Sequence, residues 1–163
     1  MQLNTAIIYE YMNKKNTQQF VDLDNAREDE QKQVMQEIIT ADHCPFCLEN
    51  LRKYHKQPIL KEGKYWILTK NQWPYKYTKI HLLAIYKEHA TKLSELDPQS
   101  GVELLQFMQW AEREHKIPGG GWAMRFGDTN YSAGTVNHLH VQFIQPDIEH
   151  PEFEPVRIKL GKG

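Results

Sequence analysis

The sequence has few cysteines, no long apolar run and no excess of charge of either sign, and each absence narrows its function. Two cysteines among 163 residues are too few for the disulfide framework of a small secreted protein. The longest apolar runs are far too short to span a membrane, and the segment Met1 to Thr5 lacks the pattern of a secretory signal. The formal net charge is −1, with acidic and basic residues intermixed, which argues against duplex nucleic acid as a partner. We therefore expect a cytoplasmic protein with no membrane and no nucleic acid among its partners.

Helix and strand patterns follow one another in an order typical of one α+β domain, for which 163 residues suffice. The segment Asp24 to Thr40 is rich in helix formers and carries one apolar stripe, so it predicts an amphipathic helix. Asp97-Pro98 predicts the start of a long helix that ends near His115. Segments that are rich in β-branched and aromatic residues, or that alternate polar and apolar residues, predict strands over 64–69, 80–86, 122–126 and 137–144. This order indicates an antiparallel sheet crossed by one long helix.

The most informative segment is Asn137 to Ile144, where polar and apolar residues alternate. His138, His140 and Gln142 fall on one face of the predicted strand, and successive members lie roughly 6.5–7 Å apart. Two imidazoles and an amide on a rigid element suggest a site in which one imidazole attacks a phosphorus while its neighbour is anchored elsewhere. The alternative is a half-exposed strand that happens to carry histidines.

Cys44-Pro45-Phe46-Cys47 has the spacing of a zinc site. Two thiolates supply half of a tetrahedral shell, and histidines or acids must complete it because the sequence has no other cysteine. The residues alone do not choose among the eight histidines, of which His43 is the nearest in sequence. Two alternatives remain open: metal-free buried cysteines, and a thioredoxin-type redox motif, whose βαβ context is missing here.

The pattern His-x-His-x-Gln-x-x, with apolar residues at each x, resembles the signature of the histidine-triad (HIT) superfamily. Most members carry a third histidine at the position of Gln142. The glutamine form resembles the branch that contains galactose-1-phosphate uridylyltransferase and dinucleoside polyphosphate phosphorylases. The resemblance covers Cys44 to Pro146. It implies the α+β HIT fold, with an antiparallel sheet of about five strands and a long crossing helix. The implied division is an N-terminal helical extension (1–42), a HIT-like domain (43–150) and a C-terminal tail (151–163).

The resemblance also narrows the zinc ligands. In the uridylyltransferase branch, a histidine after the second central strand and the first histidine of the signature complete the shell begun by Cys-x-x-Cys. His89 and His138 match these two positions. The implied cofactor is one structural zinc ion held by Cys44, Cys47, His89 and His138. Because four protein ligands leave no open position for water, this metal is not expected to act in catalysis.

His140 aligns with the nucleophile of the family. Its neutral imidazole would attack an α-phosphate to give a nucleotidyl-histidine intermediate, which water or another phosphate then resolves. Gln142 can hydrogen-bond a phosphoryl oxygen but cannot give a proton to the leaving group. We therefore expect a nucleotidyltransferase or nucleotide hydrolase acting on a dinucleoside polyphosphate or a nucleoside diphosphate-linked compound. The alternatives are a nucleoside phosphoramidate hydrolase and a zinc-stabilised nucleotide-binding module without turnover.

Two loops supply candidate substrate contacts. The hydroxyl-rich loop 128–137 suits either a phosphate cradle or an ordinary polar connection, and the resemblance favours the cradle. The residues predicted to bind phosphate there are Asp128, Ser132, Gly134 and Thr135, although the family more often has glutamine-serine at the last two positions. The segment 71–75 resembles an Asn-x-aromatic-Pro-Tyr segment of the phosphorylases. It predicts that Asn71 and Trp73 contact the nucleoside, with a core-packing loop as the alternative.

Small HIT proteins are commonly dimers, and the predicted long helix carries more apolar residues than one stripe needs. These are Leu104, Leu105, Phe107, Met108 and Trp110. A helix that is apolar on more than one side is usually buried on more than one side. A homodimer is therefore expected.

Overall fold

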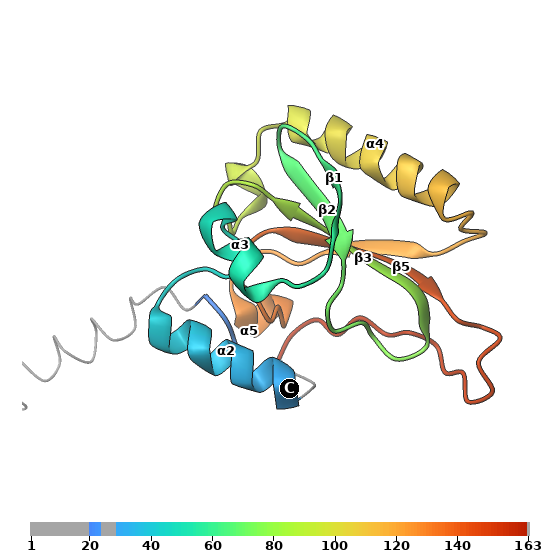
Figure 1. Cartoon of the computed structure of the whole chain (residues 1–163), viewed down its shortest axis with the longest axis horizontal. Coiled ribbons are helices and arrows are strands. Elements are labelled where there is room, and N and C mark those ends of the chain that lie inside the picture. Colours follow the sequence, from blue (N-terminus) through green and yellow to red (C-terminus); the bar gives the residue numbers. More distant parts are fainter. Residues whose placement is uncertain (1–19, 24–28, 163) are drawn as a thin grey trace, which may run out of the picture.

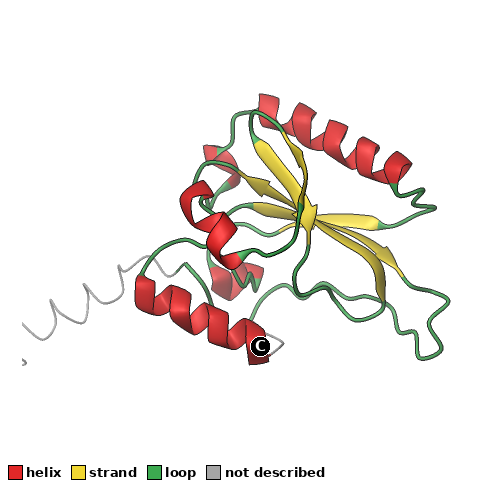
Figure 2. Ribbon diagram, in the orientation of Figure 1, coloured by secondary structure: helices red, strands yellow, loops and turns green. Residues whose placement is uncertain are grey.

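One antiparallel sheet forms the centre of the structure, a computed structural model that describes residues 20–23 and 29–162. Its strands are β1 (Ile59–Glu62), β2 (Trp66–Lys70), β3 (Thr78–Tyr86), β4 (Gly121–Met124) and β5 (His140–Pro146). They lie in the order β1-β2-β3-β5-β4, and every neighbouring pair is antiparallel. The predicted α+β class with a five-stranded antiparallel sheet is confirmed (Figure 2).

Helices lie on both sides of this sheet. The helices in the described part of the chain are α2 (Asp29–Ala41), α3 (Leu48–Tyr54), α4 (Gln99–Glu114), α5 (Thr129–Ser132) and the short 3-10 helix η2 (Leu93–Glu95). The long helix α4 runs along one side, whereas α2, α3 and α5 gather on the other (Figure 1). None of the described helices has the length and apolar character needed to cross a membrane.

Both predicted helices are present. At the start of α4, the N–H of Gln99 donates to Oδ1 of Asp97 at 2.8 Å, which is the capping contact that Asp97-Pro98 predicted. The helix predicted over 24–40 is observed as α2, although residues 24–28 lie outside the described residues. Residues 1–19 of the predicted N-terminal extension lie outside them as well.

Some elements differ from the sequence-based prediction. The sequence did not predict β1 or α3, because a four-residue strand and a seven-residue helix are too short to show a clear period. The strand predicted over 122–126 ends at Met124. The predicted loop 128–137 contains the single helical turn α5, whose N-cap is Asp128.

The main core lies between α4 and the sheet. Trp66 on β2 is fully buried, and its indole N–H donates to the carbonyl of Ser100 at 2.8 Å, so it ties the strand to the helix. The buried residues of α4 in this core are Leu104, Phe107, Met108 and Ala111. Burying each large side chain of this kind contributes roughly 1.5–3 kcal/mol. Leu105, by contrast, is 51% exposed, so α4 has an apolar residue on its outer side.

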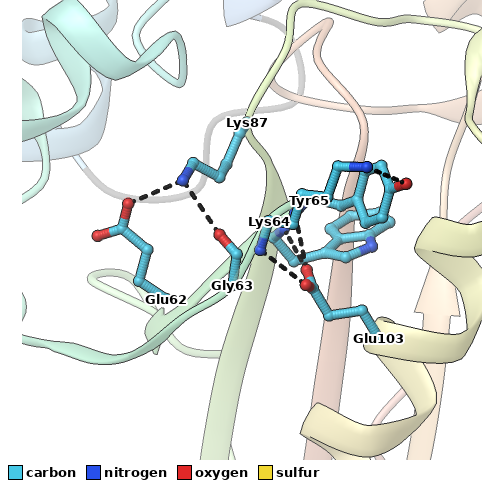
Figure 3. A network of polar contacts seen from close by, with 7 residues as sticks. Glu62, Gly63, Lys64, Tyr65, Lys87 and Glu103 are labelled. Atoms are coloured by element: carbon cyan, nitrogen blue, oxygen red, sulfur yellow. Dashed lines mark hydrogen bonds and ion pairs between the residues drawn. The ribbon is translucent and has the colours of Figure 1, made fainter.

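A carboxylate of α4 holds the turn between β1 and β2 (Figure 3). Glu103 accepts hydrogen bonds from the backbone N–H groups of Lys64, Tyr65 and Trp66 at 2.7, 2.8 and 2.8 Å. Gly63 lies against the same carboxyl group, where a Cβ would overlap it. This contact fixes the edge of the sheet to the helix and leaves the opposite face for the site.

A second, smaller cluster attaches α2 to that opposite face. Its buried members are Val21, Met35, Ile38 and Tyr54. Val21 also pairs with Val136 in an isolated antiparallel bridge, so the segment before α2 lies beside the loop that leads into β5. As a result, α2 lies over the face of the sheet that carries the polar residues of β5.

Candidate functional site

Four sulfur and nitrogen donors meet where β3 ends and β5 begins. Cys44, Cys47, His89 and His138 each offer one ligand atom, and all of these atoms lie within 4.8 Å of one another. The backbone brings them together, because the N–H of Leu139 donates to the carbonyl of Ala90 at 2.7 Å and so aligns the two histidine segments. His43 points elsewhere: its Nε2 lies 2.8 Å from the hydroxyl of Tyr54.

The distances within this cluster suit a tetrahedral zinc ion. Zinc bonds of about 2.3 Å to sulfur and about 2.0 Å to nitrogen place donor atoms roughly 3.3–3.8 Å apart in a tetrahedron. Nδ1 of His138 lies 3.2 Å from Sγ of Cys44 and 3.9 Å from Sγ of Cys47, which lies 3.5 Å from Nδ1 of His89. The donor set therefore fits the group that the sequence predicted.

Hydrogen bonding and burial prepare the cluster for a metal. Nε2 of His138 lies 2.6 Å from the carbonyl oxygen of Tyr86, which places the ring proton on Nε2 and leaves Nδ1 as a donor for the metal. Burial lowers the pKa of His138 to about 4 and raises the pKa of the Cys44 thiol to about 12. Without a metal, the cluster is thus uncharged at neutral pH, because burial also raises the pKa of Cys47 and lowers that of His89.

His140 lies two residues further along and is held differently. Its Nδ1 lies 2.8 Å from the carbonyl oxygen of His138, so Nδ1 carries the proton and Nε2 keeps its lone pair. Burial lowers the pKa of His140, with the nearby charge of Arg125 acting in the same direction. The ring of Phe46 packs edge-on against the His140 ring, with the two ring centroids 5.2 Å apart. His140 is therefore a neutral, oriented imidazole.

Gln142 contacts a histidine that the sequence-based prediction did not include. Its Oε1 lies 3.2 Å from Nε2 of His81, and both side chains are 6% exposed. The backbone N–H of Tyr75 donates to Nδ1 of His81 at 3.1 Å, so the ring proton is on Nε2 and is donated to Gln142. A protonated Nε2 cannot also accept from Nδ2 of Asn71, which lies 3.0 Å away. Because Oε1 accepts from His81, the amide NH₂ is the part of Gln142 that can donate to a hydrogen-bond acceptor such as a phosphoryl oxygen.

A cavity of about 230 Å³ lies between α2 and the face of the sheet that carries His140 and Gln142. One part of its wall is apolar and includes Val34, Met35 and Ile38 from α2. Hydrogen-bonding and charged groups make up much of the rest: His55, Asn71, Gln72, Thr135, His140, Gln142, Arg125, Arg157 and Lys159. A cavity with an apolar wall and several convergent polar groups is typical of a small-molecule site.

Comparison with solved structures gives the same architecture. A histidine triad nucleotide-binding protein from Candida albicans has a TM-score of 0.55 at 19% identity, covering 72% of this chain and 86% of that chain. A HIT family hydrolase from Clostridium thermocellum has a TM-score of 0.50 at 19% identity, covering 64% and 91%. A Hit-like protein from Bartonella henselae has a TM-score of 0.50 at 20% identity, covering 72% and 87%. The sequence matches no model of a protein family and none of the curated proteins.

The chain has the histidine-triad fold. Within this fold, the alternating segment predicted from the sequence occupies β5 and the residues just before it. His138 precedes the strand and joins the metal cluster, whereas His140 and Gln142 lie on the strand and line the cavity. The assignment to the glutamine-containing branch of HIT proteins stays a prediction.

The HIT fold brings some of the predicted substrate contacts into this cavity and leaves others outside. Asn71, Trp73 and Thr135 line it. Ser132 and Gly134 instead border a separate hollow of about 10 Å³, which has room for about one water molecule. Asp128 caps α5, where its Oδ1 accepts the N–H of Asn130 at 2.8 Å. Direct phosphate contacts by Ser132, Gly134 and Asp128 stay predictions.

Several residues of the site were not among those predicted. His81 is one, and a histidine inside the otherwise apolar strand segment 80–86 was the signal that could have identified it. Arg125 is half-buried; its guanidinium donates to the hydroxyl of Tyr75 at 3.1 Å and to the carbonyl of Lys159 at 2.9 Å. Arg157 and Lys159 come from the C-terminal tail, and no local sequence motif marks either of them.

Proposed function

We propose that the protein is a HIT-type nucleotidyltransferase or nucleotide hydrolase that forms a nucleotidyl bond to His140. The observation that supports this most directly is the state of the His140 ring. Its Nδ1–H is tied to the carbonyl of His138, and the neutral ring borders a cavity of small-molecule type. An uncharged imidazole that borders a cavity, with one nitrogen fixed by a hydrogen bond and a lone pair on the other, is suited to nucleophilic attack.

The reaction would proceed in two displacements. In the first, the lone pair of Nε2 attacks the α-phosphorus, an N–P bond forms, and the bond to the leaving-group oxygen breaks, with the electron pair departing on that oxygen. In the second, an oxygen of water or phosphate attacks the same phosphorus and the electron pair of the N–P bond returns to Nε2; an attacking water loses its proton to the solvent, whereas phosphate attacks as an anion. The NH₂ group of Gln142, oriented through its contact with His81, would donate to a phosphoryl oxygen in both steps.

Gln142 also bears on the choice of substrate. An amide cannot deliver a proton to a poor leaving group such as an amine, so the alternative of a phosphoramidate hydrolase is disfavoured. A polyphosphate or sugar phosphate leaves readily as an anion and needs no such proton. We therefore infer that the substrate is a dinucleoside polyphosphate or a nucleoside diphosphate-linked compound, with Asn71, Trp73 and Thr135 among the groups that hold it.

We further propose that the cluster of Cys44, Cys47, His89 and His138 binds one structural zinc ion. All four tetrahedral positions would be taken by protein atoms, so the metal would not activate water. Its role would be to anchor His138, the residue whose carbonyl orients His140. The metal thereby supports the position of the nucleophile without taking part in either displacement.

The intermediate itself can be observed. The protein is incubated with dinucleoside tetraphosphates of the four common bases, with and without inorganic phosphate, then quenched and weighed by intact-protein mass spectrometry. We expect a mass increase of one nucleotidyl group in the wild type and none in His140→Ala. Phosphate-dependent formation of a nucleoside diphosphate would identify phosphorolysis, and phosphate-independent product would identify hydrolysis.

The matched control is His150→Ala, because His150 is exposed and does not line the cavity. It should form the adduct as the wild type does. Tight nucleotide binding with neither adduct nor product would overturn the proposal and favour the remaining alternative, a zinc-stabilised nucleotide-binding module.

We also propose that the chain forms a homodimer. Apolar side chains remain exposed on α4 and in or just after β4, one of the two edge strands of the sheet in the described residues: Leu105 is 51%, Trp122 is 53% and Phe126 is 52% exposed. Such residues favour association over a solvated surface. Light scattering should give twice the mass of one chain, and Leu105→Glu should shift the protein toward the mass of a single chain. A single-chain mass for the wild type would overturn this proposal.

A further inference from the structure

The C-terminal tail returns to the cavity after leaving the sheet. Beyond β5 the described chain contains no helix or strand as far as residue 162 (Figure 2). Even so, Arg157 and Lys159 border the same cavity as His140. This chain therefore contributes to the site a segment that lies outside the sheet and its helices.

Several contacts hold this part of the tail in place. The guanidinium of Arg125 donates to the carbonyl of Lys159 from Nε at 3.2 Å and from Nη2 at 2.9 Å. The N–H of Gly161 donates to the carbonyl of Tyr131 on α5 at 2.6 Å. Finally, Nζ of Lys162 forms an ion pair at 2.5 Å with Asp22, whose side chain is 4% exposed. These tethers hold the backbone at Lys159 and just after it, and so limit the reach of the Lys159 side chain and of Arg157, two residues before it.

The charge of the cavity wall is one-sided. Among the described residues that line it, Arg125, Arg157 and Lys159 are basic, and none is an aspartate or a glutamate. This contrasts with the whole chain, which has a net charge of −1. In the described part of the chain, the side chains of Arg157 and Lys159 form no ion pair. Like charges around one cavity repel each other until an anion neutralises them.

The α-phosphate alone does not account for three cations. In a nucleotidyl donor this phosphate carries a single negative charge, and the amide of Gln142 is already available to it. The remaining negative charge of such a donor lies on the phosphates of the leaving group. Those phosphates gain further charge when the bond to the α-phosphorus breaks, and fixed cations stabilise charge that develops in this way.

We propose that the tail segment 155–162 is part of the active site, and that Arg157 and Lys159, with Arg125, form the subsite for a leaving group that carries one or more phosphates. The proposal rests on the nucleotidyl-transfer function proposed above and specifies its substrate class. It places leaving-group recognition on the tail, which the sequence-based division set apart from the HIT-like domain. Nucleoside triphosphates and dinucleoside polyphosphates share this chemistry, since both release a phosphate-bearing anion.

The test compares substrates that differ only in the leaving group. Wild type and the double variant Arg157→Gln, Lys159→Gln are assayed with a dinucleoside tetraphosphate, the matching nucleoside triphosphate and the matching nucleoside 5′-phosphate ester of p-nitrophenol. We expect kcat/KM to fall about tenfold or more for both polyphosphates. For the ester, whose leaving group carries no phosphate, the fall in kcat/KM should be smaller by a factor of about five or more. A loss for only one of the two polyphosphates identifies which of them is the source of the leaving group.

Binding of a phosphate chain to the proposed subsite can be measured even if no substrate is turned over. Calorimetry with inorganic tripolyphosphate should give a Kd about tenfold weaker for the double variant than for the wild type. The control is Arg113→Gln, Lys116→Gln, which removes the same charge from exposed positions at and just beyond the end of α4 and should behave as the wild type. Equal losses for all three substrates, or unchanged tripolyphosphate binding, would overturn the inference. Tripolyphosphate binding that depends on the tail, without adduct formation on His140, would instead retain the anion site and reject the proposed chemistry.

Discussion

Nε2 of His81 on β3 lies 3.2 Å from Oε1 of Gln142 on β5, and both side chains are buried. Because the N–H of Tyr75 occupies the other ring nitrogen, this contact leaves the amide NH₂ of Gln142 for the substrate. We predict that His81→Phe and Gln142→Met each lower kcat/KM by about fivefold, chiefly through kcat, because a hydrogen bond of this kind contributes about 1 kcal/mol. The measurement is steady-state kinetics on both variants.

The double variant of His81→Phe and Gln142→Met shows whether His81 acts by positioning Gln142 or whether the two residues act independently. If His81 acts only through Gln142, the second substitution adds little to the first, and the double-mutant cycle gives a coupling of about 1 kcal/mol. Losses that simply multiply would show that His81 does not position Gln142. Zinc content should stay the same in all three variants, because neither residue belongs to the metal cluster.

The stability of the sheet edge depends on Glu103. We predict that Glu103→Ala lowers the free energy of unfolding by about 2 kcal/mol, because three backbone N–H groups between β1 and β2 lose a charged acceptor. Glu103→Gln, which keeps one acceptor oxygen, should lose less. Urea denaturation measures both, and Glu112→Ala on the exposed side of α4 serves as the control, with a change within about 0.5 kcal/mol. A Glu103→Ala variant as stable as the control would contradict this account of the turn.

Zinc binding should depend steeply on pH. Burial holds the pKa of Cys44 at about 12 and raises that of Cys47, so both thiols carry protons at pH 7, whereas the lowered pKa values of His89 and His138 keep these rings neutral. Zinc takes thiolates, so binding releases about two protons and the affinity rises with pH. Calorimetry of the metal-free protein in buffers of different ionisation enthalpy measures this release.

The same titrations test the ligand set. Elemental analysis should give one zinc ion per chain, and His89→Ala should weaken binding strongly, whereas His43→Ala should not, because the His43 ring contacts Tyr54 instead of the cluster. A release of no protons, or an affinity that does not vary between pH 6 and pH 8, would show that the two cysteines are not the ligands.

Parts of the site that depend on local sequence could be predicted. Cys44 and Cys47 have their spacing within one short turn, and the alternation of β5 places His140 and Gln142 on one face. His89 and His138 needed the family resemblance, because spacing alone does not distinguish them from the other histidines. The long helix α4 was predictable from Asp97-Pro98: Asp97 accepts the N–H of Gln99, and the observed helix begins at Gln99, one residue after the predicted start.

Parts of the site that depend on contacts between residues far apart in the sequence could not be predicted. His81 lies in an apolar strand segment, and its partner Gln142 is 61 residues away, so only the pairing of β3 with β5 brings them together. Arg157 and Lys159 follow the last strand in a segment without a helical or strand pattern, and their approach to the cavity depends on tethers to Arg125 and Asp22. Short elements such as β1 have too few residues for a period to appear.

The stereochemical course at the α-phosphorus is the most direct test of catalysis through His140. A substrate made chiral at this phosphorus with oxygen isotopes is converted by the wild-type protein, and the configuration of the product is determined. Two successive in-line displacements, one by Nε2 of His140 and one by the acceptor oxygen, each invert the phosphorus, so we expect net retention. Net inversion would mean a single direct displacement by the acceptor and would contradict the nucleotidyl-histidine intermediate.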